Sequence, residues 1–96
     1  MEKIFKEIRK ERALQNGKWG IQKHNPEHWM VILMEEVGEA CSEICGMTKN
    51  FDKYRKELVQ VAAVAVTALE DFDENWKRGS DGRLERTLYE GKVCFC

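Results

Sequence analysis

The chain has 96 residues, enough for one domain with a modest hydrophobic core. Its 43% hydrophobic and 34% charged residues are typical of a folded globular protein and exclude a disordered chain. Basic and acidic residues number 16 and 17, so the net charge is −1 and the chain lacks the basic excess of a general nucleic-acid binder.

The N-terminal residues are charged and lack the continuous apolar core of a signal peptide. No window reaches the roughly 18 apolar residues that a membrane-spanning helix needs. We therefore expect a cytoplasmic protein without a membrane partner, in which the four cysteines are reduced. A tetrahedral zinc site is one interpretation of Cys41, Cys45, Cys94 and Cys96. The preferred interpretation is a pair of small apolar side chains followed by a loose tail.

A first amphipathic helix is expected from Glu2 to about Gln15, where apolar residues recur at helical spacing among many charges. The segment Asn16-Gly17-Lys18-Trp19-Gly20 is typical of a helix stop and a turn. Residues 17–25 would then form a connector that carries Trp19, Gln22 and His24.

A second helix begins with a clear signal, Asn25 as N-cap and Pro26 at the first helical position, and should end near Gly46. Its apolar stripe consists of Trp29, Leu33, Val37, Ala40, Ile44 and Met47. One edge of this stripe is a ridge of acids: Glu36, Glu39 and Glu43. The other edge is again apolar, with Met30, Met34, Cys41 and Cys45, so this helix should be covered on two sides.

A third helix is expected from a cap at Asp52 to about Lys77. From Leu58 to Leu69 it is apolar nearly all round, which is typical of the central helix of a core. One polar line follows it at helical spacing: Lys53, Glu57, Gln60, Thr67 and Asp71. A short helix is expected around Leu84 and Leu88, and the pattern of residues 91–96 assigns no element to them.

These elements predict an all-α fold, a helical bundle of three main helices plus a short C-terminal element, as a single domain over residues 1–96. Two strongly apolar helices and one weaker helix carry more hydrophobic surface than such a short chain can hide. We therefore expect homo-oligomerisation to complete the core, as a homodimer or a dimer of dimers.

Three carboxylates are expected to meet where the second and third helices face each other. Glu36 and Glu39, three residues apart, project from the same side of one helix, and Glu57 faces them from the next. Carboxylates enter an apolar seam only when they are paired or bind metal. Oxygen ligands of this kind suit Mg²⁺, which is commonly shared between a few carboxylates and substrate phosphates.

The simpler interpretation of such glutamates is a solvated helix surface paired with lysines. Two features favour a metal site here. Glu57 precedes twelve nearly apolar residues, and Gly38, between the first two acids, costs about 1 kcal/mol in a helix interior. Such a glycine is more readily explained where another backbone or a ligand approaches closely.

The segment Glu36-Val37-Gly38-Glu39, 17 intervening residues, and then Glu57-Leu58-Val59-Gln60 resembles the metal-binding signature of MazG-type all-α nucleoside triphosphate pyrophosphohydrolases. That signature is Glu-x-x-Glu, a spacer, and Glu-x-x-Asp. The resemblance covers roughly residues 12–72 and includes three further segments, Lys18-Trp19-Gly20, His28-Trp29 and Val61-Ala62-Ala63-Val64-Ala65.

The resemblance implies cleavage of a nucleoside triphosphate between its α and β phosphates, giving the monophosphate and pyrophosphate, as in clearance of unwanted nucleotides from the pool. It implies Mg²⁺ as the cofactor, with Mn²⁺ as a substitute, and Glu36, Glu39 and Glu57 as metal ligands. Gln60 stands where the family pattern has Asp, and an amide brings no charge. The consequence is a single metal, a weaker metal or lost activity; Glu43 is a candidate substitute.

For the substrate, the candidates are aromatic and basic side chains near these acids. Trp19 and His24 are candidates for the base, and Lys53 and Lys56 for the phosphates. Trp29 and Trp76 lie at core spacing and are expected to pack. Glu36 or Glu39 would take the proton of the attacking water. Two alternatives stay open: a non-catalytic nucleotide-binding protein, because of Gln60, and a structural helical adaptor.

Overall fold

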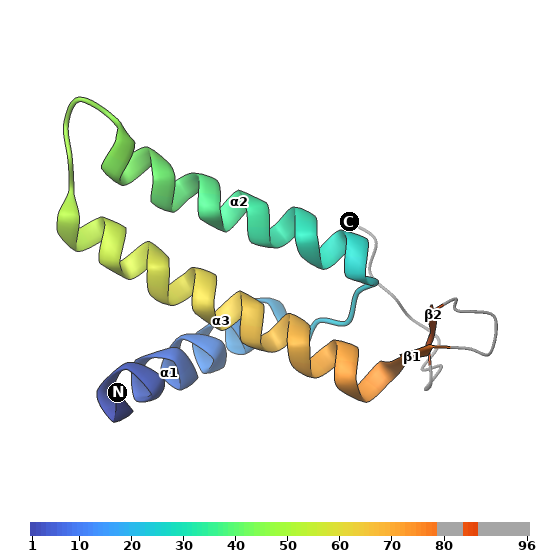
Figure 1. Cartoon of the computed structure of the whole chain (residues 1–96). Helices are drawn as coiled ribbons and strands as arrows, with labels where there is room; N and C mark the ends of the chain where they lie inside the picture. The colour runs from blue at the N-terminus through green and yellow to red at the C-terminus, as the bar shows by residue number, and fades with distance from the viewer. Residues whose placement is uncertain (79–83, 87–96) are drawn as a thin grey trace.

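A computed structural model of the chain describes residues 1–78 and 84–86. Three helices dominate it: α1 (Glu2–Trp19), α2 (Pro26–Cys45) and α3 (Phe51–Asn75). Two short strands follow, β1 (Trp76–Arg78) and β2 (Leu84–Arg86) (Figure 1). The prediction of an all-α bundle with three main helices is confirmed for the described part of the chain.

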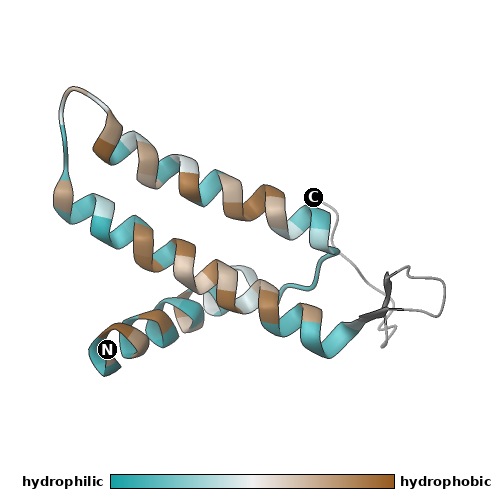
Figure 2. Cartoon of the chain, viewed as in Figure 1, coloured by the Kyte–Doolittle hydropathy of each residue, from teal (hydrophilic) through white to brown (hydrophobic). Residues whose placement is uncertain are grey.

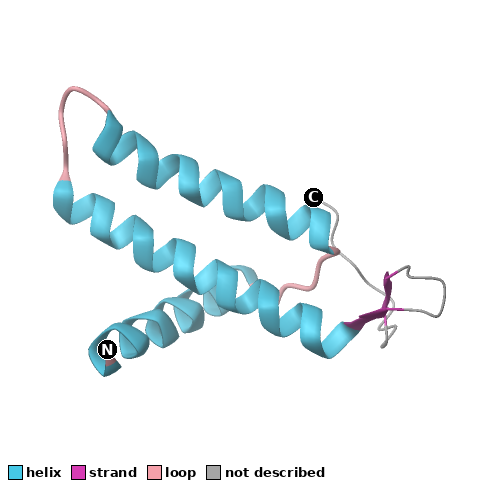
Figure 3. Cartoon of the chain, viewed as in Figure 1, coloured by secondary structure: helices cyan, strands magenta, loops and turns pink. Residues whose placement is uncertain are grey.

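Helix α3 is the central element because both other helices pack against it. Helices α2 and α3 run side by side in opposite directions, joined by a loop at one end (Figure 3). Helix α1 crosses α3 along a different face. Residues on the polar line of α3 contact both neighbours: Thr67 accepts a hydrogen bond from Arg12 of α1, and Asp71 accepts one from Trp29 of α2.

The start of α2 follows the predicted cap, whereas the start of α3 does not. The Asn25 side chain accepts a hydrogen bond from the backbone N–H of His28 at 2.8 Å, and Pro26 opens the helix. At α3 the cap is Asn50, whose side chain accepts from the backbone N–H of Lys53 at 3.1 Å. The predicted cap Asp52 is wrong: it lies in the first turn, where an acid complements the positive end of the helix dipole.

Helix α1 is one turn longer than predicted. The stop is Gly20, with φ of 77°, and its backbone N–H donates to the carbonyl oxygen of Asn16 at 2.8 Å. Glycine is the residue that adopts this left-handed conformation without steric cost. Because the helix passes through Gly17, Trp19 is the last residue of a rigid helix and not part of the connector.

The predicted short helix around Leu84 is wrong, because residues Leu84–Arg86 form strand β2. This strand pairs antiparallel with β1, opposing Trp76 to Arg86 and Arg78 to Leu84. Between the strands, the sequence Gly79-Ser80-Asp81-Gly82 has the composition of a hairpin connection, which favours strand pairing over a helix. Helix α3 accordingly ends at Asn75 and not at Lys77. Leu88 and residues 91–96 lie outside the described residues.

The apolar core of the described residues is small. Its buried members are Trp29 and Ala40 from α2 and Ala63 and Val64 from α3. Val37 and Met47 of the predicted stripe are exposed. Hydrophobic segments recur along α2 and α3, and many of these large apolar side chains stay in contact with solvent (Figure 2). Within the described part, no helix has the length and apolar composition for crossing a bilayer.

Candidate metal centre

The three predicted acids converge between α2 and α3. One carboxylate oxygen from each of Glu36, Glu39 and Glu57 lies within 4.8 Å of those of the other two. The first two lie on adjacent turns of α2, and Glu57 reaches them from α3 because the two helices run side by side. Glu35 is exposed and is not part of this group. The carboxylates therefore form a cup of oxygen ligands supplied by two helices.

The cup becomes more buried from Glu39 to Glu57. Glu39 is exposed, Glu36 is half-buried, and Glu57 is only 9% exposed. The Oε2 atoms of Glu36 and Glu57 are both buried, and neither has a hydrogen-bond partner among the described residues. A buried carboxylate oxygen without a donor is costly, because it loses its hydration without replacement.

Burial and mutual repulsion disfavour the charged form of these acids. Burial raises the pKa of Glu36 most, and the charges of Glu39, Glu57 and then Glu11 raise it further. Burial likewise raises the pKa of Glu57, the hydrogen bond and charge of Glu39 add to this, and Lys53 opposes it. In the protein alone, the positive charge of Lys53 therefore compensates these effects only in part.

A hard divalent cation fits this environment. All three candidate ligands are carboxylates, the ligand type that Mg²⁺ and Mn²⁺ prefer. Two of these carboxylates, Glu36 and Glu57, also have a buried oxygen without a hydrogen-bond partner, and a cation bound by these groups would offset the cost of burying them. The residues present are therefore chemically suited to hold the cation, with water or substrate completing its coordination.

Gln60 lies one turn after Glu57 and lines the same cleft as Glu36 and Glu39. Gln60 therefore lies beside the cup. Glu43, the candidate substitute for the missing acid, raises the pKa of Glu57 by its charge but is not one of the three converging acids. It forms an ion pair with Lys53, from Nζ to Oε1, at 3.3 Å. This ion pair joins the start of α3 to the end of α2. It involves Lys53, one of the two lysines predicted to bind the phosphates.

Two clefts lie beside the acids, and residues of α1 line both of them. One, of about 310 Å³, is lined by Glu36, Glu39 and Gln60 together with Glu11, Lys18 and Trp19 from α1. The other, of about 940 Å³, follows α1 and α3 and includes Lys10, Lys53, Lys56, Glu57 and Gln60. The predicted residues Trp19 and Lys56 thus lie beside the acids. The sequence does not identify Lys18 and Glu11 as site residues, because nothing in their local pattern shows which side of α1 meets α3.

Trp19 presents its ring at the mouth of the smaller cleft. It is 55% exposed, and the Lys18 ammonium lies 4.8 Å from the centre of its ring. A cation at this distance is attracted by the face of the indole. An exposed aromatic face and an adjacent ammonium thus lie at the edge of the acidic cup.

His24 lies apart from the acids and has a structural role. It is 2% exposed, and its backbone N–H donates to Asp71 Oδ2 at 2.9 Å. Its ring packs against His28 and Trp29, with centroid distances of 4.4 and 4.8 Å. Among the described residues, His24 lines an apolar groove between α2 and α3 and neither of the two clefts at the cup.

Asp71 is a buried structural acid whose role the sequence pattern did not reveal. Its Oδ2 accepts from the indole N–H of Trp29 at 2.7 Å as well as from His24, and its Oδ1 accepts from the Asn75 amide at 2.6 Å. The available signal was an acid on the polar line of α3 together with a tryptophan whose N–H needs an acceptor when buried. Asp71 thereby holds the α1–α2 connector and the first turn of α2 against α3.

The exposed pair Cys41 and Cys45 lies on the opposite edge of α2. Their sulfur atoms are 3.3 Å apart, and the hydrogen bond to Cys45 raises the pKa of Cys41. Both side chains are exposed, so they do not pack as core residues. Cys94 and Cys96 lie outside the described residues, and the four-cysteine zinc site stays a prediction.

No protein-family model, curated protein or solved structure matches this chain. The features of this chain that bear on its function are therefore the three acids, the clefts beside them and the sequence signature that includes these acids.

Proposed function

We propose that this chain is a magnesium-dependent nucleoside triphosphate pyrophosphohydrolase. The observation that carries the proposal is the convergence of Glu36, Glu39 and Glu57, since Glu36 and Glu57 each have a buried oxygen without a hydrogen-bond partner among the described residues. These acids are also the ones that form the signature resembling MazG-type enzymes. The acids whose burial a cation would compensate are thus the same acids that the sequence signature associates with a metal ion.

In the proposed reaction Glu36, Glu39 and Glu57 would hold Mg²⁺, with Gln60 beside them. When bound, the cation would neutralise polyphosphate charge and activate water for attack at the α-phosphorus. Glu39 is the most exposed of the three acids and opens onto the smaller cleft, so it is assigned the proton of the attacking water, with Glu36 as the alternative. The products would be the nucleoside monophosphate and pyrophosphate.

The substrate is assigned to the two clefts beside the acids, which residues of α1 line. Trp19 offers an exposed ring face for the base, and stacking on an aromatic face tolerates any base. Lys18 and Lys56 lie at the two clefts and supply positive charge for the phosphates. Lys53 is a weaker candidate because it is paired with Glu43.

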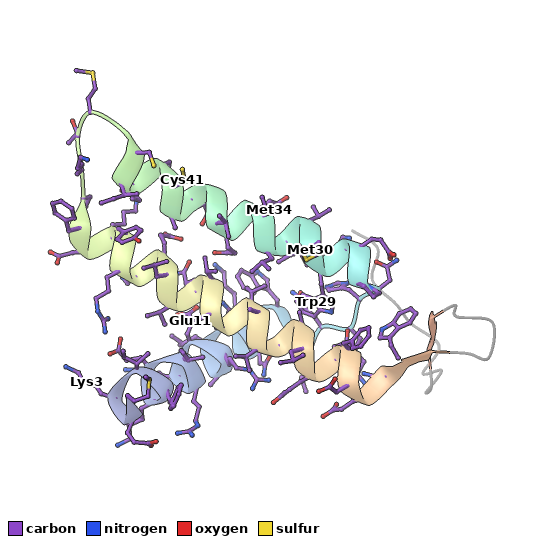
Figure 4. All side chains as sticks on the ribbon, viewed as in Figure 1. Lys3, Glu11, Trp29, Met30, Met34 and Cys41 are labelled. Atoms are coloured by element: carbon purple, nitrogen blue, oxygen red, sulfur yellow. The ribbon has the colours of Figure 1, made fainter. Side chains whose placement is uncertain are left out.

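We further propose that the chain acts as a homodimer or a dimer of dimers. An apolar groove of about 300 Å³ lies between α2 and α3, and its exposed lining includes Met30, Leu69 and Phe72. Met30, Met34 and Cys41 follow one another along α2 (Figure 4). Only four apolar side chains are buried among the described residues, so burial of this surface against a second copy is the favoured way to complete the core.

The test is pyrophosphate release from a panel of nucleoside triphosphates with and without Mg²⁺. We expect activity that requires the cation and falls by at least about 100-fold in Glu57→Gln, because a buried ligand loses its charge. Glu35→Gln is the matched control, since it removes an exposed carboxylate from α2. Absence of Mg²⁺-dependent hydrolysis for every nucleotide would contradict the proposal.

A second candidate is a nucleotide-binding protein without catalysis, and Gln60 favours it because the signature has an acid there. The Gln60→Asp variant separates the two functions. If the wild type is inactive and the variant hydrolyses nucleotides, the chain is a binding protein with a degenerate catalytic site. If the wild type is already active, the amide is sufficient.

A further inference from the structure

The acidic cup has a fourth carboxylate beside it, supplied by α1. Glu11 is half-buried and lines the smaller cleft together with Glu36, Glu39 and Gln60. It also lines the larger cleft together with Glu57 and Gln60. Glu11 is therefore the α1 acid that shares a cleft with every member of the predicted metal signature. In Figure 4 it lies where α1 passes α3.

The position of Glu11 is held by ion pairs on both sides of it in the sequence. One turn earlier, Glu7 binds Arg55 of α3 through two hydrogen bonds, at 2.7 and 2.9 Å. The next residue, Arg12, donates to Thr67 at 3.1 Å and binds Glu70 through both terminal nitrogens. Helix α1 has no buried residue of its own, so these contacts contribute to its placement on α3.

This placement brings like charges together. Among the described residues Glu11 forms no ion pair, and its side chain accepts a hydrogen bond from Gln15 at 3.3 Å. Its charge is one of those that raise the pKa of Glu36. The adjacent Glu57 is nine-tenths buried, with one oxygen unpartnered. A helix that is clamped so as to add a negative charge beside an orphaned carboxylate favours occupation of the site by a cation.

We propose that Glu11 is a fourth carboxylate that supports the divalent-cation site from α1, outside the group of three converging ligands, and supplies the charge that Gln60 lacks. The inference rests on the proposed function, because it adds a supporting residue to the same centre. It differs from the sequence-based expectation, in which Glu43 replaces the missing acid; Glu43 is instead paired with Lys53. It also gives α1 a role in metal binding in addition to its contact with the substrate clefts.

The test is Mn²⁺ affinity, measured by calorimetry and by loss of the free-ion paramagnetic resonance signal, without any substrate. We expect Glu11→Gln to weaken Mn²⁺ binding by at least about tenfold, the range found when groups supporting a metal site are removed. Glu35→Gln is the matched control, because Glu35 also raises the pKa of Glu36 but lines neither of the two clefts beside the cup. It should change the affinity by less than about threefold, the scale of an exposed charge effect.

A double variant tests the exchange of roles directly. Gln60→Asp should restore most of the Mn²⁺ affinity of Glu11→Gln, because it returns the fourth carboxylate from α3. Equal losses in Glu11→Gln and Glu35→Gln, or no rescue in the double variant, would overturn the inference and leave the proposed enzyme intact. A wild type that binds no Mn²⁺ would overturn both. Circular dichroism of each variant checks that the helices are unchanged.

Discussion

Trp29 and Asp71, 42 residues apart, are joined by a hydrogen bond of 2.7 Å from the indole N–H to Oδ2. Both side chains are buried, at 6% and 5% exposed. The bond fixes the first turn of α2 against the last turns of α3, at the end of the bundle where the connector from α1 arrives. The relative placement of α2 and α3 in turn determines whether the acids of the two helices meet.

Asp71→Ala should therefore destabilise the fold strongly. The substitution removes the acceptor of the buried Trp29 indole and of the His24 backbone N–H, and each lost partner costs about 1–3 kcal/mol. We expect the free energy of unfolding to fall by about 3 kcal/mol in urea titrations. Asp73→Ala, an exposed acid on the same helix, is the control and should change it by less than about 0.5 kcal/mol. Equal effects of the two variants would contradict this role of Asp71.

Metal binding should be visible as thermal stabilisation. A ligand that binds only the folded state adds about 2.7 kcal/mol at a concentration of 100 times its dissociation constant. We expect Mg²⁺ or Mn²⁺ to raise the Tm of the wild type and of Glu35→Gln, and to leave Glu57→Gln unchanged. In EDTA the order should reverse, since Glu57→Gln removes a buried, unpartnered anionic oxygen and should melt higher than the wild type. A Tm of Glu57→Gln below that of the wild type in EDTA would contradict this account.

The pH dependence of the metal-free protein follows from the raised pKa values of Glu36 and Glu57. Both acids have higher pKa values folded than the ordinary 4.5, so the folded state binds protons more tightly than the unfolded chain. Their ionisation consequently destabilises the fold at neutral pH, and this penalty is relieved as the pH falls toward 4.5. We expect the Tm of the wild type in EDTA to rise as the pH is lowered from 7 toward 4.5. The rise should be smaller in Glu57→Gln.

At lower pH the opposite effect takes over. Arg55 lowers the pKa of Glu7, and Arg12 lowers the pKa of Glu70, so these ion pairs stabilise the fold above the unfolded pKa. Their contribution is lost as the pH falls through the lowered folded values. Together the two effects predict a maximum of the Tm at mildly acidic pH. A Tm in EDTA that decreases steadily as the pH is lowered from 7 would contradict this prediction.

Helix α1 should loosen when Arg12 is replaced. Arg12→Gln removes the bonds to Glu70 and weakens the one to Thr67. We expect faster amide hydrogen exchange in residues 2–19, with little change in α2, because these contacts join only α1 and α3. Arg9→Gln, an exposed residue of the same helix, is the control. Uniform acceleration across all three helices would show that α1 does not detach on its own.

Self-association should depend on the apolar groove between α2 and α3. Leu69→Glu places a charge on this exposed surface, where burial against a second copy would require its desolvation. We expect sedimentation to show a shift toward monomer at micromolar concentration. Ile21→Glu is the matched control, because Ile21 is 80% exposed and lies in the connector. A wild type that sediments as a monomer would contradict the proposed assembly.

Local signals in the sequence were sufficient where neighbouring residues decide the structure. Asn25 and Pro26 started α2 as predicted, because a cap bonds to a backbone N–H three residues away. The spacing of Glu36 and Glu39 placed both on one side of a helix. Where two local signals competed, the prediction was wrong: Gly17 and Gly20 both looked like a helix stop, and only Gly20 adopts the left-handed conformation. At the start of α3, Asn50 and Asp52 are both residues that favour a helix cap, and only Asn50 is the cap.

The sequence by itself determined the helices, their polar and apolar faces, and the acids that belong together, since each depends on periodicity along one segment. Only the tertiary structure decided which residue of α1 lies beside those acids, which acid is the buried acceptor of Trp29, and that Lys53 pairs with Glu43. The physical reason is that a contact between two helices depends on how they cross and rotate. That geometry is determined by packing and ion pairs between residues far apart in the chain, which the pattern of neither helix contains.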